Sequence, residues 1–215
     1  MGENVITRKH EITYLGFVLE ANLSGDKMAS RVIKKVNQRT SFLYRVSPLV
    51  NYSTMRTLMG TLVQPIFDYA CASWYLSTSK TLQTRLHTSQ NKLLRLLLAL
   101  APRAHLTPAH FSKVGWLRVE DRVKQLARGL VYKIHYTSLI PQYMSNYFQN
   151  VKDLHNHNTR GSSTNHVKLR FRSNKGLNSF SFYATTMWNA LPQNVKESAS
   201  LTTFKTALKE QLLKI

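Results

Sequence analysis

The sequence predicts a mainly α-helical protein, and three of its features lead to this expectation. Apolar residues recur every three or four positions over long stretches, which is the pattern of amphipathic helices. Prolines and small polar residues separate these stretches, as they do at helix ends. Residues typical of a strand are concentrated near the N-terminus. We therefore expect a helical bundle with a short N-terminal strand element and a small α-rich C-terminal unit.

The strand element precedes the first helix. Residues 12–19 (ITYLGFVL) predict one strand, kinked at Gly16. Residues 22–26 (NLSGD) are typical of a turn, and we expect Ser24 or Asp26 to cap the helix that follows. Residues 1–10 are polar and lack the apolar run of a signal peptide, so we expect none.

The first helix, residues 27–46, is predicted to be amphipathic with a strongly basic outer face. Its apolar stripe consists of Met28, Val32, Ile33, Val36 and Leu43. The opposite face carries Lys27, Arg31, Lys34 and Arg45, with no acid four residues away from any of them. A solvated helix face usually mixes charges of both signs, so this asymmetry indicates a surface that faces phosphates. Arg31 and Lys34 are our candidates for binding nucleic acid here.

A second helical region contains one isolated acid and the single cysteine of the chain. Pro48 ends the first helix, and a second helix is predicted to begin at Ser53 and to kink or restart at Pro65. Asp68 is a lone carboxylate and cannot hold the metal pair of a polymerase, so we expect it to pair with a nearby arginine. Cys71 lies in an apolar run and is predicted to be a small buried residue rather than a nucleophile.

Residues 80–101 form the longest strongly periodic run of the sequence. Leucines at helical spacing define its buried stripe: Leu82, Leu86, Leu93, Leu94, Leu97, Leu98 and Leu100. The face opposite these leucines carries Arg85, Lys92 and Arg95, which are further candidates for phosphate contacts. We expect Ser79 to cap this helix and Pro102 to stop it. A helix of this kind is more commonly a buried element with a solvated charged edge.

Three aromatic residues in this region have two alternative interpretations. Tyr44, Tyr52 and Trp74 can stack on nucleic-acid bases. At helical spacing, however, aromatic residues belong to the core more often than to a binding surface.

Two more helices complete the central region. Thr107 and Pro108 are a typical helix start, and Gly115 is expected to end this short helix. Residues 117–136 predict a further amphipathic helix, and Pro141 closes the helical region.

The last third of the chain begins with a polar, basic segment. Lys168, Arg170 and Arg172 alternate with apolar residues, which predicts a short strand with one basic face. Arg160, Arg170 and Arg172 form a second group of candidate nucleic-acid-binding residues. His155 and His157 have no third ligand at metal-binding spacing, so we expect a loop and no metal site. Two helices, residues 180–191 and residues 201–213 capped by Ser200, are predicted to close the chain.

These predictions divide the chain into four segments. They are a strand element (residues 1–25), a helical domain (residues 26–145), a basic linker with a short strand (residues 146–178) and a C-terminal helical unit (residues 179–215).

The charge of the chain is the most informative part of its composition. The chain has 215 residues with 30 Lys+Arg against 10 Asp+Glu, a formal net charge of +20. Between Lys27 and Arg118 the sequence contains one acid, Asp68. Such a segregated excess is most often balanced by a polyanion, with nucleic acid as the first candidate and an anionic membrane surface as the second. The basic helices also carry the core stripes, so we expect no membrane partner.

The expected cellular compartment follows from the single cysteine and from the lack of a long apolar run. One cysteine cannot form a disulfide within the chain, which is typical of reducing surroundings. The longest apolar run, residues 96–101, is too short to span a bilayer. We expect an intracellular protein, nuclear or cytoplasmic, without a cofactor.

Four short motifs, in this order along the chain, carry a resemblance to a known family. They are YLG at residues 14–16, LVQPIFDYA at residues 62–70 followed by Trp74, HNTR at residues 157–160, and WNALP at residues 188–192 followed by FK at residues 204–205. With this order and spacing, the chain resembles the C-terminal, post-palm region of the reverse transcriptases of LINE-type (non-LTR) retrotransposons of the jockey-like kind. Each motif is weak by itself, but together they span nearly the whole chain.

The resemblance implies a thumb-like helical bundle that grips the template–primer duplex of an RNA-directed DNA polymerase. It also implies that the catalytic carboxylates of the palm lie upstream of the YLG motif, and nothing in this sequence matches them. We therefore expect no catalytic residues, and RNA or an RNA–DNA hybrid as the partner. The first residues, MGEN, do not resemble the family and suggest a new start or a truncated element.

Three functions remain open from the sequence. The chain can be a binding module that contacts nucleic-acid phosphates without catalysis. It can be a polymerase by ancestry that acts only with a palm supplied elsewhere. It can also be an inactive retroelement relic or a protein-interaction module, with apolar surface available for a palm domain or for self-association.

Overall fold

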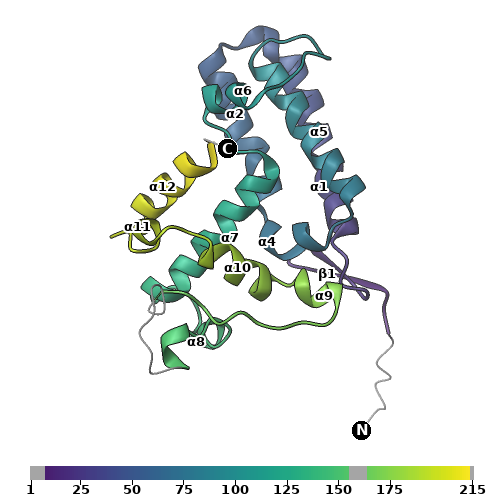
Figure 1. The fold of residues 1–215 in the computed structure, drawn as a ribbon. Coiled ribbons are helices and arrows are strands. Elements are labelled where there is room, and N and C mark those ends of the chain that lie inside the picture. The colour runs from purple at the N-terminus through teal and green to yellow at the C-terminus, as the bar shows by residue number, and fades with distance from the viewer. Residues whose placement is uncertain (1–7, 155–163, 214–215) are drawn as a thin grey trace.

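The computed structural model describes residues 8–154 and 164–213, and these residues are mainly α-helical (Figure 1). The strands are β1 (Glu11–Tyr14) and β2 (Phe17–Glu20). The helices of the first half are α1 (Asp26–Val46), α2 (Tyr52–Leu62), α3 (Gln64–Asp68), α4 (Cys71–Trp74) and α5 (Lys80–Leu97). Those of the second half are α6 (Pro108–Val114), α7 (Val119–Tyr136), α8 (Gln142–Ser145), α9 (Asn174–Leu177), α10 (Phe180–Asn189), α11 (Gln193–Lys196) and α12 (Leu201–Leu213). Short 3-10 turns are η1 (Ser47–Leu49), η2 (Tyr75–Ser77) and η3 (Val151–Asp153).

The N-terminal strand element is a hairpin, so the prediction of one strand over residues 12–19 is wrong. Strands β1 and β2 pair antiparallel, with Tyr14 opposite Phe17 at the turn. The two turn residues, Leu15 and Gly16, have φ of 48° and 80°. Positive φ at both central positions is the geometry of the tightest hairpin turn, and it reverses the chain where a kink was expected. The hydroxyl of Tyr69, at the end of α3, donates to the carbonyl oxygen of Leu15 and holds this turn.

Helices α1 and α5 lie side by side and run in the same direction (Figure 1). Their starts are joined because the backbone N–H of Ser79 donates to Asp26 Oδ1 at 2.7 Å. Further along, Ser89 Oγ donates to Asn37 Oδ1 at 3.4 Å. The side chain of Asp26 therefore binds the backbone at the start of α5. At the start of α1, Ser24 Oγ accepts the backbone N–H of Asp26 at 3.0 Å.

Helix α5 ends at Leu97, four residues before the predicted end at residue 101. Ala99 has a φ of 50°, and this left-handed conformation turns the chain out of the helix before Pro102 is reached. At the other end, Ser79 is the N-cap residue as predicted, although its hydroxyl makes no capping bond in the described chain.

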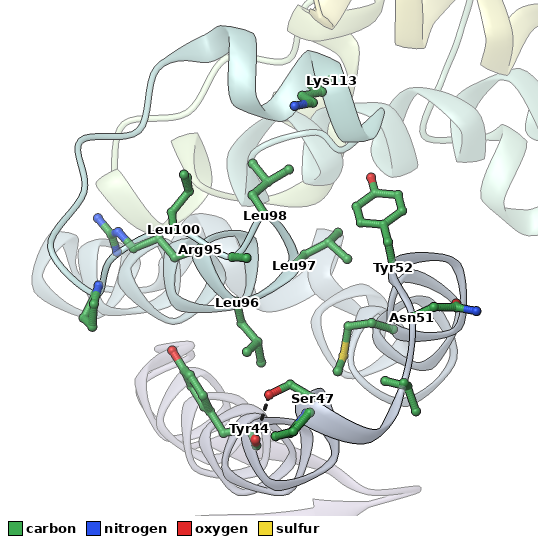
Figure 2. Close-up of a pocket in the computed structure, with 15 residues that line it drawn as sticks. Tyr44, Ser47, Asn51, Tyr52, Arg95, Leu96, Leu97, Leu98, Leu100 and Lys113 are labelled. Carbon is green, nitrogen blue, oxygen red and sulfur yellow. Dashed lines mark hydrogen bonds between the residues drawn. The ribbon is translucent and has the colours of Figure 1, made fainter.

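The breaks between the shorter helices follow the prolines. Helix α2 begins after Asn51, whose Oδ1 accepts the backbone N–H of Thr54 at 2.9 Å, so the cap is two residues earlier than the predicted Ser53. The restart predicted at Pro65 is confirmed, because α2 ends at Leu62 and α3 contains Pro65 in its first turn. Between α1 and α2, Ser47 Oγ donates to the carbonyl oxygen of Tyr44 at 2.8 Å (Figure 2).

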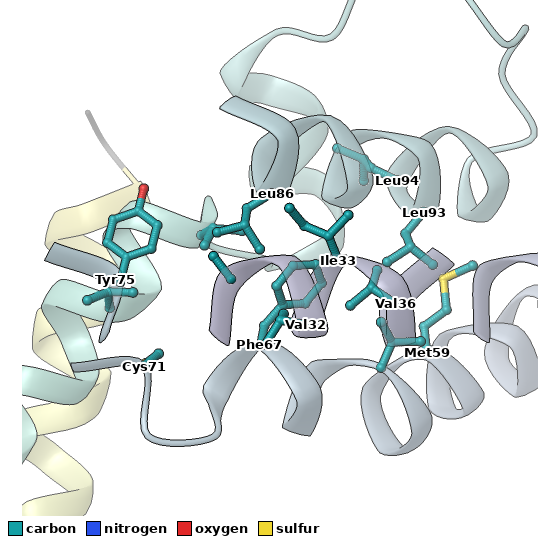
Figure 3. Packing of buried hydrophobic residues seen from close by; sticks show 14 of the residues in the cluster. Val32, Ile33, Val36, Met59, Phe67, Cys71, Tyr75, Leu86, Leu93 and Leu94 are labelled. Carbon is teal, nitrogen blue, oxygen red and sulfur yellow. The ribbon is translucent and has the colours of Figure 1, made fainter. Parts of the chain in front are cut away.

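A first hydrophobic core lies between α1, α2, α3 and α5 (Figure 3). Val32 and Val36 of α1 face Phe67 of α3 and Met59 of α2, and Leu86 and Leu93 of α5 cover them from the other side. These positions are the predicted stripes of α1 and α5, which confirms both helices as core elements. Trp74 is 1% exposed and belongs to this core, so of its two interpretations the core one is confirmed.

A second hydrophobic core is built around the C-terminal half of α7. Val131 and Tyr132 of α7 pack with Trp188 of α10 and with Phe204 and Leu208 of α12. The N-terminal half of α7 belongs to the first core through Val119 and Val123. Helix α7 is therefore the element that joins the two cores, and it runs through the middle of the molecule (Figure 1).

The segment before α9 differs from its prediction. Residues 167–172 form no strand, and the one β-bridge nearby pairs His166 with Asn150. Alternation of apolar and basic residues was too weak a signal here because the described chain offers this segment no second strand with which to form a ladder. The expected loop at His155 and His157 lies outside the described residues.

No helix in the described part of the chain combines the length and the apolar character that a membrane span requires.

Candidate nucleic-acid interface

Three of the predicted cations share the outer face of the α1–α5 pair. The contact between Asn37 and Ser89 marks the line along which the two helices touch. Lys34 lies one turn before Asn37, and Arg85 and Lys92 lie one turn before and after Ser89. All three side chains are exposed and project away from the core. We call Lys34, Arg85 and Lys92 the outer face.

Arg31 is close to the outer face but belongs to the flank of α1 that meets the hairpin. Its side chain is half-buried and lines a cavity of about 340 Å³ together with Leu15, Gly16 and Lys35. Arg31 is one turn before Lys34 in the sequence, but the structure places its side chain in this cavity, so we leave it out of the outer face.

Arg95 has a structural contact that the sequence pattern did not indicate. Its Nε donates to the carbonyl oxygen of Ala104 at 2.9 Å, which fixes the loop that follows α5. The side chain is half-buried and lines a pocket at the end of α5. The structure therefore separates Arg95 from Arg85 and Lys92, although the helical projection groups all three.

The second group of predicted cations lies elsewhere. Arg170 and Arg172 are exposed on the segment that runs from beside α8 to α9, at the far end of the molecule from α2 and α6 (Figure 1). Arg160 lies outside the described residues. The structure does not bring this pair onto the outer face.

Three acids of α3 and α7 form ion pairs with residues of α7. Asp68 accepts two hydrogen bonds from Arg122, at 3.0 Å from Nε and 2.6 Å from Nη2. This confirms the prediction that Asp68 pairs with an arginine, and the hydrogen bond to Asp68 raises the pKa of Arg122 further. Glu120 and Asp121 both contact Lys124 Nζ at 2.9 Å.

Lys27, on the basic face of α1, has an acidic partner. Its Nζ forms an ion pair with Glu11 of β1, a partner that comes from outside the helix. The hydrogen bond to Glu11 raises the pKa of Lys27. The helix itself offers Lys27 no acid four residues away, and this partner is available because the hairpin folds back onto the start of α1. Lys34 lies two turns further along α1 than Lys27, away from the hairpin and its Glu11.

The chemistry of the remaining candidates is structural. Cys71 is buried, and burial together with the nearby Asp68 raises the pKa of its thiol to about 12. A thiol with this pKa stays protonated at neutral pH, so Cys71 is a core residue, as predicted. Among residues 8–154 and 164–213, no three His, Cys, Asp or Glu side chains cluster as metal ligands do.

Two of the three aromatic residues with alternative interpretations, Tyr44 and Tyr52, are exposed. Tyr44 and Tyr52 are 46% and 49% exposed and line the pocket at the end of α5, so the core interpretation is wrong for both. A signal was present for Tyr44, because it lies off the centre of the apolar stripe of α1. No comparable signal was available for Tyr52, which follows the N-cap of α2 and faces the pocket only in the folded chain.

Comparison of the chain with models of protein families, with curated proteins and with solved structures finds no match in any of the three. The family resemblance of the four motifs stays a prediction, and function is inferred from the geometry.

Proposed function

We propose that this protein binds the phosphate backbone of RNA or of an RNA–DNA hybrid through the outer face of α1 and α5. In this proposal it is a non-catalytic, thumb-like C-terminal fragment of a LINE-type reverse transcriptase. The observation that carries the proposal is the outer face itself. Lys34, Arg85 and Lys92 are exposed on two adjacent parallel helices, in a region whose one acid, Asp68, is bound by Arg122.

The physical basis is the release of counterions from the nucleic acid. Each phosphate that a lysine or arginine neutralises frees a condensed cation, so affinity falls steeply as salt rises. Contacts to phosphates carry no sequence information, and binding is therefore expected to tolerate any sequence. Two rigid helices hold their cations at fixed spacing, which favours a backbone of regular geometry.

Hydrogen bonds made by residues of the family motifs support the proposal. Tyr69 of the second motif donates to the carbonyl oxygen of Leu15 in the first motif. Asn189 of the WNALP motif binds both backbone groups of His166, at 2.9 Å and 2.8 Å. In the described part of the chain, Tyr69 and Asn189 of these motifs thus hold segments of the fold together.

The test is fluorescence anisotropy of the purified chain with single-stranded RNA, an RNA–DNA hybrid and duplex DNA, each over a salt series. We expect the tightest binding to the hybrid, with an affinity that falls steeply with salt. Weak binding without preference among the three would contradict the proposal.

We expect no primer extension by the isolated chain, and extension would overturn the non-catalytic assignment.

A second candidate function is supported by the exposed apolar surface of the hairpin. Ile12, Tyr14 and Leu15 are 47%, 70% and 78% exposed, and Leu23 after β2 is 60% exposed. In addition, Leu15 holds a positive φ that leucine rarely adopts. Exposed apolar residues of this kind mark surfaces that bind another protein, here a palm domain or a second copy of the chain.

Size-exclusion chromatography with light scattering tests this second candidate. We expect the wild type to self-associate and the variant Leu15→Asn, which suits the turn and removes an exposed leucine, to do so less. A monodisperse wild-type monomer at high concentration would count against self-association.

A further inference from the structure

A pocket lies at the end of the α1–α5 pair (Figure 2). The pocket has a volume of about 790 Å³ and lies between the ends of α1 and α5, the start of α2 and the loop after α5. Tyr44 and Leu96 line this pocket, and they lie two turns beyond Asn37 and Ser89 on the same contact line. Lys92 is one turn before Leu96, about 6 Å along the helix axis.

The pocket has the chemical character of a site for a flat ring. Its walls are mostly leucine and other apolar side chains, and the rings of Tyr44 and Tyr52 are half-exposed along it. Arg95 and Lys113 bring positive charge to it. Asn51 adds a side-chain amide whose Nδ2 can donate to a base edge, while its Oδ1 accepts the backbone N–H of Thr54.

We propose that this pocket holds one unstacked base of a single-stranded nucleic-acid segment whose phosphates lie on the outer face. The inference rests on the proposed function and adds a base-binding site to it. Aromatic rings bind bases of any type because every base presents a π-face, so the site is expected to be sequence-tolerant.

Charge selects this occupant over an apolar peptide. Residues 27–118 contribute every side chain of the pocket, and their one acid, Asp68, is bound by Arg122 outside it. Arg95 Nε donates to the carbonyl oxygen of Ala104, which holds this cation at the pocket, while the other N–H groups of its guanidinium remain donors for an anionic ligand. An apolar helix in this pocket would gain nothing from these cations.

The experiment compares binding of two fluorescein-labelled single-stranded RNAs of equal length. One has its bases, and the other has the same backbone with abasic positions. The protein variants are Tyr44→Leu with Tyr52→Leu in one chain, and a matched control, Tyr143→Leu with Tyr147→Leu, at two exposed tyrosines near α8. Thermal unfolding of each variant establishes that it folds, and Kd is measured over a salt series.

We expect the pocket variant to bind the normal RNA ~5- to 100-fold more weakly than the wild type, which is the range for one stacked base. The slope of affinity against salt should stay unchanged, because the phosphate contacts remain. The abasic RNA should bind the wild type about as weakly as the normal RNA binds the pocket variant. The control variant should bind both RNAs as the wild type does.

Three outcomes would overturn the inference, and they differ in what they leave standing. If the wild type binds RNA with a steep salt dependence but the pocket variant binds equally well, the base site is wrong and the proposed function stands. The same conclusion follows if the pocket variant weakens both RNAs equally, because the effect then does not involve a base. If the wild type binds no nucleic acid at all, both proposals fail.

Discussion

The carboxylate of Asp68 connects two helices that are far apart in the sequence. It receives two hydrogen bonds from Arg122 of α7 and one from Gln64 Nε2 at 2.9 Å. The pair is partly buried, with side-chain exposures of 33% for Arg122 and 22% for Asp68. Removing one partner of such a pair leaves the other without its counter-charge, which costs more than removing a surface ion pair.

We expect Asp68→Asn to lower the free energy of unfolding by about 1–2 kcal/mol, since a neutral amide cannot accept both hydrogen bonds from Arg122. Urea unfolding monitored by circular dichroism measures this change. Glu120→Gln is the matched control, because its ion pair with Lys124 is more exposed and should contribute about 0.5 kcal/mol or less. Equal effects of the two substitutions would contradict the structural role of Asp68.

His166 is a buried histidine that sequence reasoning did not single out. It is 1% exposed, stacks on His135 with ring centroids 4.3 Å apart, and lies beside Trp188 and Phe148. Burial, followed by the neighbouring His135 and Lys196, lowers the pKa of His166 to about 3. Burial lowers the pKa of His135 as well.

These lowered pKa values make the fold sensitive to acid. Below about pH 6.5 the unfolded chain binds protons on histidines that the folded chain keeps neutral, so stability falls as the pH drops from 6.5 towards 3. Between about pH 7.5 and 5, we expect His166 to lower the free energy of unfolding of the wild type by about 2 kcal/mol. The variant His166→Phe should not show this part of the pH-dependent loss. Urea unfolding at a series of pH values tests this. Parallel pH profiles for wild type and variant would exclude His166 as the cause.

At the scale of elements, Gly25 allows the start of α1 to meet the turn after α4. A Cβ atom built on Gly25 would lie 2.1 Å from the carbonyl oxygen of Trp74 and 2.6 Å from Thr78 Oγ1. The carbonyl of Trp74 is also held by Thr78 Oγ1 at 2.9 Å, so it cannot move away without breaking this hydrogen bond. The close approach is what lets Asp26 reach the backbone of Ser79.

We expect Gly25→Ala to destabilise the protein by about 2–4 kcal/mol, because backbone must shift to make room for the methyl group. Gly60→Ala is the matched control. Gly60 is exposed within α2 and a Cβ there meets nothing within 4 Å, so alanine should stabilise the helix by about 0.5–1 kcal/mol. Thermal and urea unfolding measure both variants, and a neutral Gly25→Ala would mean that α1 does not approach Trp74 in this way.

The helices were predictable where periodicity and caps agreed. Helices α1, α6 and α7 begin and end within about two residues of their predicted limits, and the capping box of Thr107 and His110 explains the accuracy for α6. The hairpin was not predictable as such, because leucine is an unfavourable residue for the positive φ of its turn. The early end of α5 was missed for a similar reason, since Ala99 adopts a left-handed conformation that alanine seldom takes.

At the scale of the whole molecule, α7 determines how the two halves meet. It contributes to both cores, and Tyr132 donates from its hydroxyl to the carbonyl oxygen of Ser198 at 2.7 Å. Arg128 of the same helix is buried and donates to the carbonyl oxygen of Met187 at 3.3 Å. Helix α7 therefore holds the C-terminal helices α10 and α12 against the rest of the molecule.

The candidate site was partly predictable from the sequence. The sequence identified Lys34, Arg85 and Lys92 by helix periodicity, but it could not show that α1 and α5 are parallel neighbours. That arrangement depends on contacts between distant residues, such as Asp26 with Ser79. It also could not separate Arg95, whose hydrogen bond to Ala104 forms only when the chain turns back after α5.

The most direct measurement of the central claim is the salt dependence of RNA binding by the triple variant Lys34→Gln, Arg85→Gln and Lys92→Gln. Its control carries the same change of charge off the outer face, with Lys133→Gln, Lys152→Gln and Lys205→Gln on α7, η3 and α12. Fluorescence anisotropy with an RNA–DNA hybrid gives Kd at each salt concentration for both variants and the wild type.

We predict that the outer-face variant binds more weakly and that its slope of log affinity against log salt falls by about 2–3, since each substituted cation no longer neutralises a phosphate. The control variant should keep a slope close to that of the wild type. If both variants bind alike, binding depends on the total net charge of the chain and not on where the cations lie. The outer face of α1 and α5 is then not the nucleic-acid interface.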